Sequence, residues 1–143
     1  MTPPLKVLFL CTGNSARSIF GEYLLRRAGR FDVYSAGAFP TGEVNPFALR
    51  VLKDVYGIDA TTARSKSFEE YDCVEFDFVI TVCDNARESC PVWPGQPKVL
   101  HWSLPDPALA QGTDEEIYST FKEVAAEVQR RIESFTSDSS GRS

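Results

Sequence analysis

The sequence is poor in the residues that metal sites, disulfide scaffolds and membrane spans require. Its 143 residues include a single histidine, His101, and four cysteines, none of which form a Cys-x2-Cys pair. A zinc site would therefore have to be assembled from scattered ligands, and four cysteines are few for a disulfide scaffold of this size. No run of about 18 apolar residues occurs, so no membrane-spanning helix is expected. The sequence predicts no metal site and no membrane association.

The charge pattern argues against nucleic acid as a partner. The net charge is −5, and the lysines and arginines form no cluster. Binding to a phosphate backbone needs a concentrated basic face, so we expect no nucleic-acid partner. The first residues do not show a basic segment followed by a long apolar stretch, which is typical of a secretory signal, and we therefore expect a cytoplasmic protein.

Length and composition predict one domain. A chain of 143 residues that is 43% hydrophobic and 24% charged has ordinary values for a globular domain with its own core. We place this single domain at residues 1–136 and expect a monomer. The Ser- and Gly-rich residues 137–143 are expected to form a disordered tail.

Short apolar runs alternate with helical patterns along the chain. The predicted strands are residues 6–10, 32–36, 77–82 and 98–102. Helices are predicted from about Arg17 to Gly29, from Pro46 after the cap Asn45, and after the capping box of residues 113–116. Strands separated by helices pair in parallel through right-handed crossovers. We expect an α/β fold with an open four-stranded parallel sheet, order 2-1-3-4, and helices on both faces, as in flavodoxin-like proteins.

The segment CTGNSARS (residues 11–18) follows the first predicted strand. A chain that turns through Gly13 and Asn14 into a helix directs several N–H groups into one concavity, where the helix N-terminus adds positive potential. Cys11 should exist there largely as thiolate, and Arg17 can grip two oxygens of an oxyanion. A generic strand-turn-helix with a buried cysteine is the alternative. The groups expected to bind the anion belong to Thr12, Gly13, Asn14, Ser15, Ala16 and Arg17.

The spacing Cys-x5-Arg-Ser, with Asn14 three residues after Cys11, resembles the low-molecular-weight tyrosine phosphatase superfamily. Further segments look like the branch that reduces arsenate: VYSAG (33–37), TVCDNA (81–86), CPVWPG (90–95), HW (101–102) and PDP (105–107). The resemblance implies that Cys11 attacks the bound oxyanion and that Asp106 protonates the departing oxygen. Ser18 can return its hydroxyl to the thiolate, and Asn14 has a structural role in the loop.

The same resemblance implies a relay of three thiols. Arsenate condenses with Cys11, Cys83 attacks Cys11 and releases arsenite, and Cys90 then moves the disulfide to Cys83–Cys90. A helix over residues 83–90 would separate the two Cα atoms by about 10 Å, whereas a disulfide needs about 7 Å or less, so we expect this segment to unwind on oxidation. No cofactor would be bound, and the external thiol reductant would be thioredoxin, or glutaredoxin with glutathione.

Two other functions stay open. A low-molecular-weight protein tyrosine phosphatase would use Cys11, Arg17 and Asp106 and leave the later cysteines as packing residues, and a catalytically idle oxyanion sensor could use the same fold. Phosphatase relatives usually have a second cysteine where this chain has Ala16, and aromatic residues where it has Ala108 and Leu109, so the resemblance favours the reductase. Some reductases hold potassium through a carboxylate where this chain has Lys66, so we expect no potassium requirement.

Overall fold

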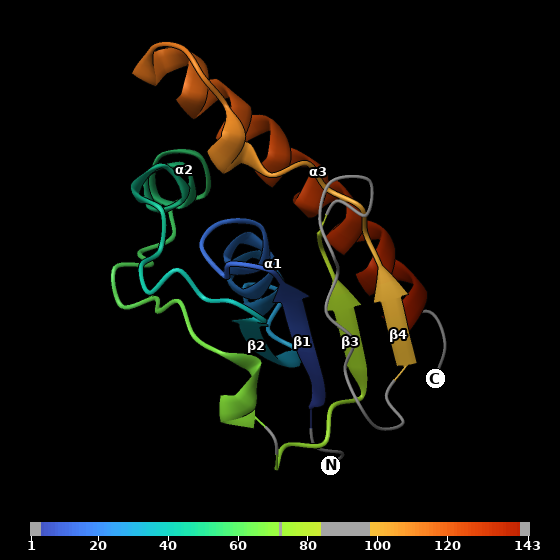
Figure 1. Ribbon diagram of the computed structural model, residues 1–143. Helices are drawn as coiled ribbons and strands as arrows, with labels where there is room; N and C mark the ends of the chain where they lie inside the picture. The colour runs from blue at the N-terminus through green and yellow to red at the C-terminus, as the bar shows by residue number, and fades with distance from the viewer. Residues whose placement is uncertain (1–3, 72, 84–97, 141–143) are drawn as a thin grey trace.

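A single open sheet organises the molecule. The computed structural model describes residues 4–71, 73–83 and 98–140. The four strands lie in the order β2-β1-β3-β4, and every neighbouring pair is parallel. The fold class predicted from the sequence is confirmed, and the strands differ from their predicted bounds only at their ends. These strands are β1 (Leu5–Cys11), β2 (Phe31–Gly37), β3 (Phe78–Thr81) and β4 (Lys98–His101), all with their carboxyl ends at the same edge (Figure 1).

Both faces of the sheet are covered, but unequally. The α-helices α1 (Arg17–Arg26), α2 (Pro46–Tyr56) and α3 (Asp114–Ser140) share one core with Val7 and Phe9 of β1. The alternate residues of β1, Leu8 and Leu10, pack on the opposite face beneath Tyr34, Tyr71 and Phe76. In the part of the chain that is described, that second face is covered by the short 3-10 helix η1 (Phe68–Tyr71) and its flanking residues. This alternation is the period of two expected for a strand buried on both sides.

The helix ends follow the local signals in the sequence. Asn45 accepts a hydrogen bond from the Phe47 N–H at 2.9 Å, and Gly57, with φ of 67°, ends α2 in the left-handed conformation. Thr113 and Glu116 bond reciprocally at the start of α3, as a capping box does. The helix α3 then continues to Ser140, past the predicted domain end at 136, so residues 137–140 are helical where the sequence predicted the start of a disordered tail. Continued i to i−4 hydrogen bonding accounts for this extension.

Among the residues that the structure describes, no helix combines the length and the hydropathy needed to cross a membrane.

Candidate active site

The loop between β1 and α1 forms a cradle at the carboxyl edge of the sheet. Cys11 is the last residue of β1, and α1 begins at Arg17. Asn14 has φ of 49°, the unusual left-handed backbone that was expected of it. The carbonyl groups of Thr12, Gly13 and Ser15 accept N–H donors from the chain after β2, at 2.8, 3.1 and 2.9 Å. A trans peptide unit points its N–H opposite to its C=O, so the N–H groups of the peptide units that contain these three carbonyls point away from the chain after β2.

The end of β2 lies against this loop and restricts its position. Gly37 is paired with Cys11 in the sheet, and its N–H donates to the Lys66 carbonyl at 2.9 Å. A Cβ added at Gly37 would lie 2.6 Å from the Thr12 oxygen and 3.0 Å from the Asn14 nitrogen. A side chain at this position would therefore displace the loop, which explains why glycine follows Ser35-Ala36 at the end of the strand.

Cys11 is a buried free thiol that two groups contact directly. It is 2% exposed. Its Sγ lies 2.9 Å from Ser18 Oγ and accepts a hydrogen bond from the Asn14 N–H at 3.2 Å. Both are the kind of contact that stabilises a negatively charged sulfur. Ser18 Oγ thus lies within hydrogen-bond distance of the sulfur, and either atom could be the donor.

Arg17 and Asp106 complete the same cavity from two different elements. The Arg17 guanidinium is buried, donates to the Leu104 carbonyl at 3.1 Å and lies 3.7 Å from the Asp106 carboxylate. Asp106 caps the 3-10 helix η2 (Pro107–Leu109) by accepting from the Ala108 N–H at 3.0 Å. The cavity has a volume of about 240 Å³, enough for a tetrahedral oxyanion. It is lined by Cys11, Thr12, Gly13, Asn14, Ser15, Ala16, Arg17, Phe39, Thr41, Asp106 and Ala108.

The second predicted thiol lies at the end of the neighbouring strand. The Val82 N–H donates to the Leu10 carbonyl at 3.0 Å, so Cys83 leaves the sheet beside the point where Cys11 does. Cys83 is buried and disulfide-bonded, whereas Cys11 and Cys73 are free. Cys90 and the predicted unwinding of residues 83–90 lie outside the described residues. The structure thus brings together Cys11, Arg17, Ser18 and Asp106 in the described part of the chain.

A buried polar network behind the loop was only partly visible in the sequence. The ammonium of Lys66 lies 3.8 Å from Glu22 Oε1 and 3.2 Å from Ser35 Oγ, and Asn14 joins these groups to the loop. Burial lowers the pKa of Lys66, and the nearby Glu22 carboxylate acts in the opposite direction. Sequence reasoning singled out Lys66 but missed Glu22 and Ser35. A glutamate on the buried face of a helix and a serine within a buried strand were the available signals.

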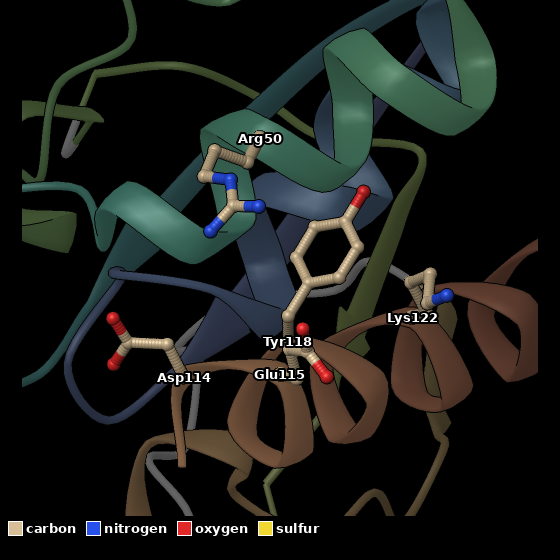
Figure 2. Close-up of a pocket in the computed structure, with 5 residues that line it drawn as sticks. All are labelled: Arg50, Asp114, Glu115, Tyr118 and Lys122. Carbon is tan, nitrogen blue, oxygen red and sulfur yellow. The ribbon is translucent and has the colours of Figure 1, made fainter.

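A second cavity, about 350 Å³ in volume, lies between α2 and the start of α3 (Figure 2). Arg50 and Lys122 both pack over the ring of Tyr118, at 4.4 and 5.0 Å from its centroid, and the Tyr118 hydroxyl donates to Asp54 at 3.1 Å. The cavity is also lined by two carboxylates, from Asp114 and Glu115. None of its five lining residues carries a thiol, whereas Cys11 lines the first cavity. We therefore take the Cys11 cavity as the candidate active site.

Comparisons with known proteins agree with this fold. The chain is 39% identical to an arsenate reductase of Halalkalibacterium halodurans over 131 residues, which are 90% of this chain and 93% of the relative. The crystal structure of an arsenate reductase from Archaeoglobus fulgidus has a TM-score of 0.76 and 31% identity, covering 90% of this chain and 97% of that one. A thioredoxin-dependent arsenate reductase from Corynebacterium glutamicum has a TM-score of 0.62 and 29% identity, covering 92% and 63%. Residues 6–140 match the family model described as low molecular weight phosphotyrosine protein phosphatase, and the chain belongs to that family.

Proposed function

We propose that this chain is an arsenate reductase, which converts arsenate to arsenite at Cys11. The observation that carries the proposal is the position of Cys11: its sulfur contacts Ser18 and the Asn14 N–H at the base of a cavity that Arg17 and Asp106 also line. The names of its relatives support the choice of arsenate as the oxyanion.

The first step is substitution at arsenic. The Cys11 thiolate forms an S–As bond as an As–O bond breaks, and Asp106 supplies the proton that allows the oxygen to leave as water. Arg17 and the N–H groups of residues 12–17 hold the remaining oxygens. No electrons have moved to arsenic at this stage.

The second thiol, that of Cys83, carries out the reduction. The Cys83 thiolate attacks the Cys11 sulfur, the S–As electron pair passes to arsenic, and arsenite leaves with a Cys11–Cys83 disulfide behind it. Cys90 then attacks Cys83, which frees Cys11 and leaves a Cys83–Cys90 disulfide. Because Cys83 is disulfide-bonded here, it must be reduced before it can take part.

The two electrons of each turnover come from an external thiol reductant, and we propose no bound cofactor or metal. The thioredoxin-dependent relative from Corynebacterium glutamicum makes thioredoxin the first candidate, with glutaredoxin and glutathione as the other. The proposed enzyme acts as a monomer in a reducing compartment, the cytoplasm, where such reductants are kept.

A second activity is favoured by one residue of the cavity wall. Phe39 is 77% exposed and lines the cavity, so an aromatic ring bonded to phosphate would find an apolar surface there. Phosphotyrosine-type hydrolysis would use Cys11, Arg17 and Asp106 and would not need Cys83.

The variant Cys83→Ser separates the two activities. We expect arsenite production to fall to background with both a thioredoxin system and a glutaredoxin system, supplied separately, while p-nitrophenyl phosphate hydrolysis is retained. Cys73→Ser, which removes an exposed free thiol, is the matched control and should change neither rate. Undiminished arsenite production by Cys83→Ser would overturn the reductase mechanism.

A further inference from the structure

The cavity between α2 and the start of α3 has no part in the reaction proposed at Cys11. Its volume of about 350 Å³ lies within the roughly 300–1,000 Å³ that is usual for small-molecule sites. One lining residue, Arg50, comes from α2, and the other four come from the first turns of α3. The cavity therefore lies where the two helices meet, and its lining residues are Arg50, Asp114, Glu115, Tyr118 and Lys122 (Figure 2).

Four of these five side chains are charged, and the opposite charges do not pair with one another. Between residues that the structure describes, no ion pair includes Arg50, Lys122, Asp114 or Glu115. The two cations pack instead over the ring of Tyr118, at 4.4 and 5.0 Å from its centroid. Two cations and two carboxylates thus border one space without neutralising each other by direct contact.

The positions of these groups are set by contacts outside the cavity. The Tyr118 hydroxyl donates to Asp54 of α2 at 3.1 Å, so the ring is held between the two helices. Asp114 lies in the first turn of α3, where the unpaired N–H groups of a helix stabilise a carboxylate. In Figure 2 the Arg50 guanidinium and the Asp114 carboxylate lie to one side of the Tyr118 ring, and Lys122 lies to the other. A ligand would therefore meet a cation and an anion that are already in place.

This arrangement selects for the charge of the ligand. A simple anion would satisfy Arg50 but would be repelled by Asp114, and a simple cation would meet the opposite difficulty. A ligand that carries both charges satisfies both groups, and the planar guanidinium can hold a carboxylate through two parallel hydrogen bonds.

We propose that the cavity binds a zwitterionic ligand of the α-amino acid class, with its carboxylate at Arg50 and its ammonium at Asp114. Lys122 and Glu115 supply a further charge of each sign at the border, and Tyr118 supplies an apolar wall for the side chain of the ligand. The proposal goes beyond the reaction at Cys11 and does not depend on it.

Three probes of one carbon skeleton test the requirement for both charges. L-norvaline carries the ammonium and the carboxylate, n-butylamine lacks the carboxylate, and pentanoate lacks the ammonium. In titrations of the 15N-labelled protein followed by NMR, we expect L-norvaline to bind with a Kd of about 1 mM and to shift the amide signals of Arg50 and of residues 114–122. Each analogue should bind at least about tenfold more weakly, because it leaves one charged group of the cavity without a partner. Equal affinities for the three probes would overturn the proposal.

Two variants test the two contacts separately. Arg50→Gln should weaken the binding of L-norvaline at least about tenfold and leave that of n-butylamine unchanged, since only the carboxylate contact is lost. Asp114→Asn should weaken L-norvaline to a similar extent and leave pentanoate unchanged. Arg30→Gln is the matched control, because it removes the same charge from an exposed arginine that packs over Phe31 and does not line the cavity. The same loss in Arg30→Gln as in Arg50→Gln would assign the effect to net charge and contradict the site.

The carboxylate of the probe has another possible destination, the oxyanion cradle at Cys11. The titration is therefore repeated after Cys11 has been alkylated with iodoacetamide in a Cys73→Ser background, which fills the cradle. We expect the Kd for L-norvaline to stay the same. Loss of binding on alkylation would place the probe in the cradle and overturn the proposal. These titrations need neither arsenate nor a reductant, so their outcome is separate from that of the reductase assignment.

Discussion

The Arg17 guanidinium lies 3.7 Å from the Asp106 carboxylate, at the cavity that ends on Cys11. Arg17 is 4% exposed and held by the Leu104 carbonyl, whereas the Asp106 side chain is 29% exposed. A fixed cation and a more accessible acid are therefore in contact across 89 residues of sequence, the first suited to holding an oxyanion and the second to delivering a proton.

Asp106→Asn should separate proton delivery from anion binding. The amide oxygen can still cap η2 at the Ala108 N–H, so the local structure is preserved. We expect phenyl phosphate turnover to fall by about 100-fold or more, in the range of general acid catalysis. p-Nitrophenyl phosphate, whose leaving group needs less protonation, should lose less. Equal losses for both substrates would contradict the role of Asp106 as the acid.

Gly37→Ala should distort the oxyanion cradle, although Gly37 itself does not line the cavity. The new methyl group would lie 2.6 Å from the Thr12 oxygen, which belongs to the backbone and cannot rotate away. We expect phosphate binding, followed by calorimetry, to weaken by at least about tenfold, since a shifted loop misplaces several donors. Gly21→Ala is the contrasting variant: its Cβ would meet the Phe9 ring at 2.4 Å, so it should lower the melting temperature by overpacking the core. If Gly37→Ala binds phosphate as the parent does, the close packing described here does not restrain the loop.

Asn45→Ala should destabilise α2 without touching the cavity. Its side chain caps the helix at Phe47, and the substitution leaves that N–H without its partner while the Asn45 N–H still bonds to the Ser15 carbonyl. The expected loss is about 1 kcal/mol in the free energy of unfolding, measured with urea. Asn45→Asp keeps an acceptor oxygen and should therefore retain most of the parent's free energy of unfolding. A full loss in the aspartate variant would show that the cap is not the cause.

Tyr71 makes stability depend on pH in the alkaline range. Burial, with the nearby Glu22 and Glu70 carboxylates, raises the pKa of Tyr71 from its ordinary value of 10.0 to about 12. A group whose pKa is raised by folding stabilises the native state fully below its unfolded pKa and loses that contribution as the pH rises through the folded one. Unfolding free energies should therefore fall between about pH 10 and about pH 12, and fall less in Tyr71→Phe. The same decline in both proteins would assign the loss to other groups.

Local signals were sufficient for most elements of the fold. The cap at Asn45, the capping box at Thr113 and the apolar runs of the strands act over a few residues, so their outcome does not depend on the rest of the chain. The end of α3 was misjudged because the composition of residues 137–140 resembles a tail, while a helix already formed extends at little cost.

The network behind the loop shows the limit of such reasoning. Lys66 meets Asn14 across 52 residues of sequence and Ser35 across 31, and neither spacing corresponds to a helical or strand period. Glu22 and Ser35 are ordinary polar residues until the sheet places them beside each other. The shared donors and acceptors, and hence the direction of each hydrogen bond, exist only after packing.

The sequence by itself determined the order of strands and helices, the cysteine at the end of the first strand and the arginine six residues later, because each follows from periodicity, capping and spacing within one segment. Only the tertiary structure decided that Asp106 faces Arg17, that β2 braces the loop through Gly37 and that Lys66 lies behind Asn14. Those contacts join segments tens of residues apart, and their geometry is set by the register of parallel strands and the close packing of the core.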